Sequence, residues 1–200
     1  MLQFTTDLAV PLTIDFDLEE RLAEIPREMT VKGMFLARAA GVLGSDLQAI
    51  LPTLTHPPRF GRFIPFADYP VVDHMRVSVL AAFKEHPRLA KAEAIRIYER
   101  ESVHTVAAST IGKVMVKLIP DVKAAYMRVP ETSRMIAPSW EIKAFVEGER
   151  TVRLSYRNSA GFLDCGTIGS LEGIALMYKE TPKIEVILAT RRSADYIVRW

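Results

Sequence analysis

Through the first two thirds of the chain, hydrophobic and polar positions follow the period of an α-helix. Asp17 is placed to cap a short helix over 18–25, and apolar residues at helical spacing predict the next helix over 33–44. Further helices are predicted over 46–52 with Ser45 as cap, over 71–85, over 89–118 with a break near Ser102, and over 121–129 after Pro120. Residues 56–70 hold four prolines and no period, which predicts a long connector.

Beyond Pro138 the period changes from helical to two, which is the period of a strand. Apolar and polar residues alternate over 140–146 and 151–157, with EGER as the turn between them. The end of the chain repeats this hairpin pattern over 183–189 and 195–200, with RRSA as the turn.

A helical pattern over 163–179 separates the two predicted hairpins. The order of elements therefore predicts an α+β fold in a single domain, 1–200. Its N-terminal helical lobe, 1–137, is followed by a ββαββ unit, 138–200, with a four-stranded antiparallel sheet.

Composition narrows the class of protein without indicating an activity. Apolar residues make up 49% and charged residues 25%, as in an ordinary globular protein, and the net charge of +2 is too small to indicate a nucleic-acid partner. Cys165 is the only cysteine, which excludes an internal disulfide. The N-terminus lacks the basic start and apolar core of a signal peptide, and no segment approaches about 18 uninterrupted apolar residues. We therefore expect a cytoplasmic chain without a membrane span.

Sequence motifs give no support to catalysis. Gly166, Gly169 and Gly173 do not form the dinucleotide fingerprint, and no Gly-Lys-Ser/Thr of a P-loop follows them. The second and third of these glycines share a helix face, which predicts that the helix approaches the sheet closely. No Ser-His-Asp order and no Gly-x-Ser-x-Gly are present. We therefore expect that the protein is not an enzyme.

Cysteine and histidine are the residues most suited to reactive or metal chemistry. Cys165 begins the helix over 163–179, but without a base nearby in sequence it is interpreted as a buried structural residue. His56 and His86 precede prolines and are expected in solvent, whereas His74 lies toward the polar flank of its helix. His104 lies mid-helix, where Glu101 is placed to orient its ring. Its position is compatible with an axial haem ligand or with a half-exposed histidine. Other metal sites are not predicted, because no histidine or cysteine pair has metal-ligand spacing.

Three segments carry a resemblance to known proteins. ADYP at 67–70, AEAIRIYERE at 92–101 and the closing DYIVRW resemble an uncharacterised family of short proteins abundant in myxobacteria, over about 31–200. The second half is also similar to haem-nitric-oxide-binding domains and to the four-vinyl-reductase domain. The resemblance implies a helical lobe and an antiparallel sheet that enclose a pocket for a small molecule.

The haem-binding family holds the haem propionates with a tyrosine, a serine and an arginine at alternate positions. The matching corner of this chain reads Tyr156, Asn158 and Ala160, so that only the tyrosine agrees. Arg157 carries the right charge, but strand alternation points it to the face opposite Tyr156. The resemblance places His104 roughly where the proximal haem ligand lies. Haem is therefore possible but disfavoured.

These observations lead to a first hypothesis and two alternatives. The first is a non-catalytic, sensor-like regulatory module that binds a small, mostly apolar molecule between helical lobe and sheet, with Tyr156, Arg157 and His104 as anchors. The second is a ligand-free interaction scaffold that forms a homodimer or contacts a protein partner through a sheet edge. The third is a haem-based gas sensor that uses His104.

Overall fold

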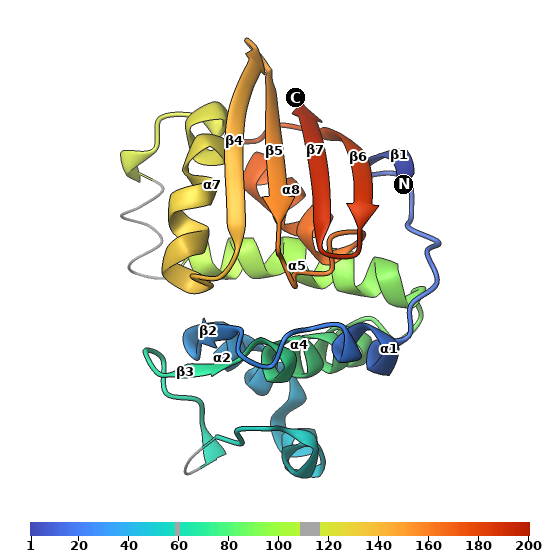
Figure 1. Cartoon of the computed structure of the whole chain (residues 1–200), viewed down its shortest axis with the longest axis vertical. Coiled ribbons are helices and arrows are strands. Elements are labelled where there is room, and N and C mark those ends of the chain that lie inside the picture. Colours follow the sequence, from blue (N-terminus) through green and yellow to red (C-terminus); the bar gives the residue numbers. More distant parts are fainter. Residues whose placement is uncertain (59–60, 109–116) are drawn as a thin grey trace.

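The protein consists of two lobes, a helical lobe and a sheet lobe. The computed structural model describes residues 1–58, 61–108 and 117–200. The helical lobe comprises α1 (Leu18–Ala23), β2 (Thr30–Lys32), α2 (Met34–Leu43), η1 (Gly44–Asp46), α3 (Leu47–Ile50), η2 (Leu51–Thr53), β3 (Asp68–Pro70) and α4 (Val71–Glu85). The sheet lobe comprises β1 (Leu2–Asp7), α5 (Lys91–Ala108), α7 (Val122–Ile136), β4 (Glu141–Gly148), β5 (Thr151–Arg157), α8 (Gly166–Met177), β6 (Lys183–Thr190) and β7 (Ser193–Arg199). This division differs from the predicted helical lobe of 1–137, because β1, α5 and α7 are grouped here with the sheet and the helix that they contact. Figure 1 shows α5 along the boundary between the two lobes.

The sheet has five antiparallel strands in the order β1-β6-β7-β5-β4. The predicted ββαββ unit is present, but the prediction of four strands was wrong, because β1 adds a fifth strand at the edge. Leu2 lies opposite Leu188 and Asp7 opposite Lys183, so that the chain's beginning pairs with a strand near its end. Such a pairing depends on contact between distant segments, which periodicity within a short segment does not reveal.

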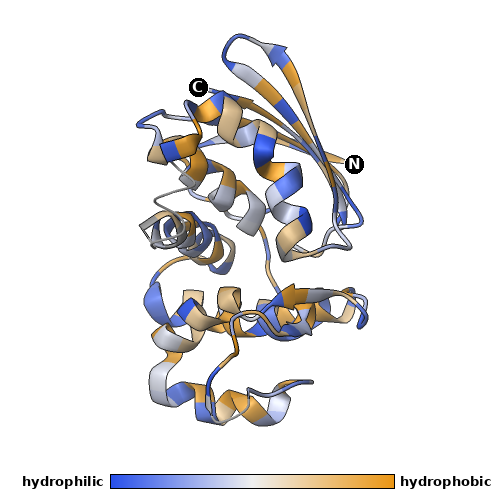
Figure 2. Ribbon diagram, turned by 90° about the vertical axis from the view of Figure 1, so that its left-hand side faces the viewer, coloured by the Kyte–Doolittle hydropathy of each residue, from blue (hydrophilic) through white to orange (hydrophobic). Residues whose placement is uncertain are grey.

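One face of the sheet forms the core of its lobe. Figure 2 shows the helices gathered on one side of the strands. The hydrophobic strand residues buried on this face are Ile142, Val152, Leu154, Tyr156, Ile184, Val186, Ala194, Tyr196 and Val198. Ile168, Leu171 and Ala175 of α8 are buried as well and belong to the same hydrophobic core. The predicted alternation of β5 is confirmed, since Val152, Leu154 and Tyr156 all point inward.

The glycines of α8 allow close contact with α5. A Cβ atom at Gly169 would lie 1.9 Å from the carbonyl oxygen of Arg96, and one at Gly173 would lie 2.7 Å from that of Arg100. Close packing by these glycines is therefore confirmed, but the surface that they approach is the backbone of α5 rather than the sheet.

A buried ion network strengthens the α5–α8 contact. The Arg96 side chain is fully buried; its Nε lies 3.0 Å from both carboxylate oxygens of Glu172, which is also fully buried. Arg96 Nη1 donates to the carbonyl of Val10 at 2.7 Å, and Glu93 accepts from the backbone N–H of Leu12 at 2.7 Å. The network therefore ties the segment after β1 to both helices.

Several helix boundaries agree with the predictions and others do not. α4 spans the predicted 71–85, and Asp17 caps α1 by accepting from the N–H of Glu20. α5 runs through Ser102 without the predicted break, and the Ser102 hydroxyl donates to the carbonyl of Tyr98 one turn earlier in the continuous helix. Its predicted continuation over 109–116 lies outside the described residues. α7 continues through Pro130 to Ile136, further than predicted.

Three smaller features of the helical lobe were also predicted differently. Ser45 lies inside η1 and does not cap α3. The connector 56–70 ends in β3, which pairs with β2. Met34–Thr53 forms the one stretch of the described chain that is long and apolar enough to cross a membrane by length and composition alone. This is weak evidence, since Leu36, Ala39 and Leu43 are buried in the protein core, and the absence of a membrane span stays a prediction.

Candidate functional site

The two lobes meet at a seam, which we define as Phe16 and Arg21 of the helical lobe with Phe162 and Asp164 of the sheet lobe. The rings of Phe16 and Phe162 meet edge to face with centroids 5.2 Å apart. Beside them, Arg21 donates to Asp164 through both Nη atoms, at 3.0 and 2.5 Å, and both side chains are buried. The seam therefore combines an aromatic contact with a desolvated, two-point ion pair.

Backbone conformation at the corner after β5 sets the position of Phe162. Phe162 has a φ of 45° and Asn158 a φ of 51°, in the left-handed region that residues with a side chain rarely adopt. Strain of this kind persists only where the surroundings hold it, and it is often found at functional sites. The corner that matches the haem-clamp segment is thus the one that places Phe162 against the other lobe.

A small cavity of about 20 Å³ lies at the seam. Its lining comprises Arg21, Glu24, Ile25, Ala160, Phe162, Arg191 and Arg192. Arg191 pairs with Glu24 at 2.6 Å and with Glu20 at 2.9 Å, both across the two lobes. Arg192 Nε is buried and has no hydrogen-bond partner among the described residues. A cavity of this volume holds about one water molecule. The arginines that line it place positive charge beside it.

Tyr156 lies in the core of the sheet lobe. Its side chain is 5% exposed, and its ring meets that of Tyr196 edge to face at 5.2 Å. Burial raises the pKa of the Tyr156 hydroxyl, so this group stays protonated at neutral pH. It is a neutral, inward-pointing group at the start of the corner.

Arg157 lies on the opposite face of the sheet, as alternation predicts. It donates to both carboxylate oxygens of Asp195, at 3.0 and 3.1 Å. Burial acts to raise the pKa of Asp195, but the hydrogen bonds from Arg157 and Ser155 outweigh it and lower that pKa overall. The Arg157 charge is therefore engaged in a cross-strand ion pair.

His104 is exposed on α5, and Glu101 does not orient it. The Glu101 carboxylate instead lies 3.6 Å from His86 Nε2 and 3.5 Å from Arg38 Nη2. The structure thus places Tyr156, Arg157 and His104 in three different environments and does not bring them together. The sequence did not predict the contact between the lobes at the seam. The one local feature that pointed to it is the pair of positive charges at Arg191 and Arg192 in the β6–β7 turn.

Cys165 is buried in the protein core. Burial raises the pKa of its thiol well above the usual value, and the adjacent Asp164 carboxylate raises it further. A thiol in this state is a poor nucleophile. The predicted burial of Cys165 is confirmed, and its structural role stays a prediction.

The described residues do not fit haem. A porphyrin pocket needs several hundred Å³, as ligand pockets do, whereas the cavity at the seam has about 20 Å³. A larger open hollow of about 390 Å³ lies between Pro120 and Trp200, but its lining holds mostly charged side chains and neither histidine nor cysteine among the described residues. The iron needs an axial ligand inside that pocket, and His104 is exposed. Of the residues that match the propionate clamp, Asn158 accepts from Arg192, and Ala160 has no polar side chain.

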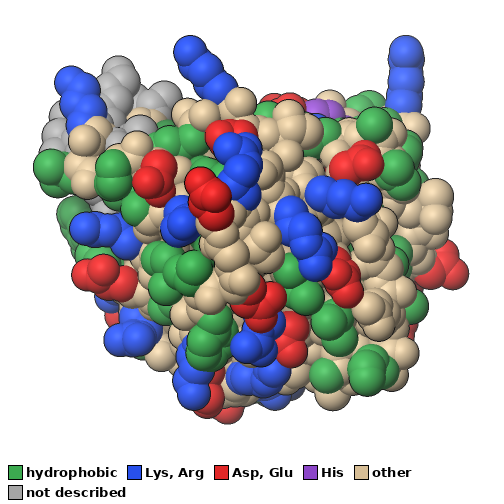
Figure 3. Space-filling model, turned by 90° about the horizontal axis from the view of Figure 1, so that it is seen from above, with side chains coloured by type: hydrophobic (Ala, Val, Ile, Leu, Met, Phe, Trp, Pro, Cys, Tyr) green, Lys and Arg blue, Asp and Glu red, His purple; other side chains and the backbone are tan. Residues whose placement is uncertain are grey.

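Surface charge agrees with the low net charge. Figure 3 shows Lys and Arg side chains interspersed with Asp and Glu over the face seen from above. Opposite charges also pair across strands, as Arg153 does with Glu147 and Arg199 with Glu185. A basic stripe of the kind that binds nucleic acid is not visible on that face.

Solved structures similar to this chain include H-NOX proteins. The Fe(II) unliganded H-NOX protein from K. algicida is 10% identical with a TM-score of 0.64, covering 84% of this chain and 95% of that one. An H-NOX protein from S. oneidensis in the Fe(II)NO ligation state is 15% identical with a TM-score of 0.59, covering 84% and 98%. At these identities the similarity establishes the fold. The predicted resemblance to haem-nitric-oxide-binding domains is therefore confirmed at that level.

Family membership follows from a match over most of the chain. No curated protein matches it. The family model described as "Protein of unknown function (DUF2378)" matches residues 25–200, which confirms the predicted resemblance to an uncharacterised family, while its abundance in myxobacteria stays a prediction. This chain belongs to that family of unknown function, and its fold is that of the H-NOX proteins.

Proposed function

We propose that the protein is a non-catalytic, sensor-like regulatory module that keeps the H-NOX fold and works without haem. A small, mostly apolar molecule binds at the seam and separates the two lobes, and the change in lobe contact is the signal. The observation that carries the proposal is the composition of the seam. Ile25, Ala160 and Phe162 form apolar walls that are bordered by arginines, and Phe16 packs against Phe162. Ligand pockets combine apolar walls with a few polar anchors in this way.

The closed seam represents the state without ligand in this proposal. Entry of a molecule larger than water requires the residues that line the cavity, Phe162 among them, to move apart, since the cavity is about 20 Å³. The unpartnered Nε of Arg192 favours a ligand that also carries an acceptor or an anionic group. Of the three predicted ligand anchors, we retain Tyr156, because it lies at the start of the corner that carries Phe162. Arg157 and His104 are not retained as anchors, because they lie at exposed positions.

A fluorescent probe with an apolar body and a sulfonate, 1-anilinonaphthalene-8-sulfonate, tests the proposal. We expect saturable enhancement of its fluorescence with one site per chain at neutral pH. Ala160→Phe fills the cavity and should abolish this binding, because Ala160 lines it and is 5% exposed. Ala90→Phe, at an exposed position before α5, is the matched control and should bind as the unmodified protein does. Equal binding by the two variants would contradict a ligand site at the seam.

A ligand-free interaction scaffold is the second candidate function. Within the described part of the chain, β4 pairs with no strand other than β5, although α7 contacts it, and Phe145 and Val146 near its end are 39% and 55% exposed. An edge strand with exposed apolar residues is suited to pairing with another chain. Native mass spectrometry separates the two functions: a bare dimer favours the scaffold, and a chain with a discrete extra mass below that of haem favours the seam ligand.

A further inference from the structure

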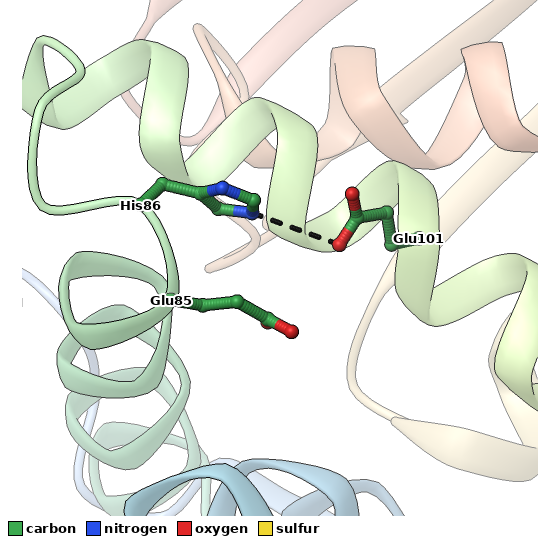
Figure 4. A group of neighbouring side chains, drawn as sticks. All are labelled: Glu85, His86 and Glu101. Carbon is green, nitrogen blue, oxygen red and sulfur yellow. Dashed lines mark ion pairs between the residues drawn. The ribbon is translucent and has the colours of Figure 1, made fainter.

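Three potential metal ligands converge where α4 passes into α5. Glu85 ends α4, His86 follows it, and Glu101 comes from the next helix. One ligand atom from each residue lies within 4.8 Å of those of the other two. Figure 4 shows the three side chains pointing into a common space, with His86 Nε2 directed at the Glu101 carboxylate. One imidazole and two carboxylates form a ligand set that first-row divalent metals accept.

The imidazole of His86, which was expected in solvent, is only 19% exposed and has an unsatisfied nitrogen at this point. Its Nε2 atom is buried and has no hydrogen-bond partner among the described residues. The nearest carboxylate oxygen, on Glu101, lies 3.6 Å away, which is beyond hydrogen-bonding distance. A buried polar atom without a partner costs free energy and calls for an explanation such as an ion. A cation between His86 and the two glutamates would use the lone pair of this nitrogen.

Arg38 is the one described cation that already faces the two glutamates. Its Nη2 lies 3.2 Å from Glu85 and 3.5 Å from Glu101. Its position does not depend on them, because Nη1 donates to the Tyr98 carbonyl at 3.0 Å and to Ser102 at 2.5 Å, and the guanidinium stacks on the Tyr98 ring at 4.1 Å. Two carboxylates against one guanidinium leave one negative charge uncompensated. A divalent cation can therefore bind in competition with Arg38 Nη2.

We propose that Glu85, His86 and Glu101 bind a zinc ion at the connection between the lobes. Tetrahedral zinc with nitrogen and oxygen ligands at about 2.0–2.2 Å holds its ligand atoms roughly 3.3–3.6 Å apart. The present spacing, within 4.8 Å, must therefore contract by about 1 Å. Both glutamates are long and partly exposed, at 33% and 43%, so their rotation supplies this contraction. The imidazole favours zinc over magnesium, which prefers oxygen ligands.

Such a site goes beyond the proposed function and does not depend on it. The bound zinc would join the end of α4 to α5 and hold the connection between the two lobes in one conformation. The fourth coordination position stays open to water, as it does in zinc sites with three protein ligands.

Isothermal titration of the full chain with zinc chloride tests the site. We expect one site per chain and a loss of affinity of more than about tenfold in His86→Ala, since removal of a ligand costs at least as much as removal of an outer-shell partner. His56→Ala is the matched control, because His56 also precedes a proline in a connector and is exposed. That variant should bind zinc as the unmodified protein does. Removal of the competing charge by Arg38→Met should tighten binding.

Two results would overturn the proposal. One is the absence of saturable zinc binding; the other is binding that His86→Ala leaves unchanged or that His56→Ala weakens equally. Glu101→Gln, which keeps the shape of the side chain, repeats the test if His86→Ala unfolds, as judged by circular dichroism. Cobalt(II) titration gives an independent readout. The visible absorption of tetrahedral cobalt(II) should appear with the unmodified protein and be lost in His86→Ala and Glu101→Gln.

Discussion

The contact between α5 and α8 predicts opposite effects for the same substitution at two helical glycines. Gly169→Ala would place a Cβ atom 1.9 Å from the Arg96 carbonyl oxygen and 2.8 Å from its carbonyl carbon. These are backbone atoms, so the clash is relieved only if the two helices separate by more than about 1 Å, which also stretches the buried Arg96–Glu172 pair. Overpacking of this kind costs about 1–3 kcal/mol, and the rigid neighbour places Gly169→Ala at about 3 kcal/mol or above.

Gly41→Ala in α2 is the matched control for this prediction. Gly41 is exposed, and a Cβ atom there would meet nothing within 4 Å. The alanine should therefore stabilise the protein by about 0.5–1 kcal/mol through helix propensity. Urea unfolding followed by circular dichroism measures both changes. A Gly169→Ala variant as stable as the unmodified protein would refute backbone contact between α5 and α8.

Stability should respond to pH and to loss of the seam ion pair in defined directions. The expected position of His74 on the polar flank of its helix is wrong, because its ring nitrogen Nδ1 is buried. Burial lowers the pKa of His74 from 6.5 to about 4, so its contribution is present above pH 6.5 and is lost as the pH falls toward 4; His74→Leu should remove roughly 3 kcal/mol of that dependence in urea unfolding at each pH. Burial raises the pKa of Glu99 from 4.5 to about 7, so stability falls as the pH rises through this window, and Glu99→Gln should abolish that fall in the same assay. Asp164→Asn should destabilise by about 3–5 kcal/mol, because Arg21 is left charged and buried, and should speed hydrogen exchange in α1. Asp68→Asn removes an exposed pair and should cost less than about 1 kcal/mol; equal losses in the two variants would contradict a special role for the seam.

The elements of the fold that depend on neighbouring residues were readable in the sequence. The helical period set the bounds of α4, Asp17 marked the start of α1, and the alternation of Val152, Leu154 and Tyr156 gave the buried face of β5. Each of these features arises because residues a few positions apart share one face of a helix or strand. The order of the last elements then determined most of the sheet.

The features that join distant segments were decided only by the tertiary structure. The sequence indicated that Gly169 permits close approach, but not that α5 is the partner, because a missing side chain does not specify what occupies the space. The residues of β1 give no indication that this strand pairs with β6. The sequence around Arg21 or His86 likewise does not indicate that these side chains lie beside Asp164 and Glu101. Periodicity records which side of an element is buried, whereas the partner on that side is selected by packing across the whole chain.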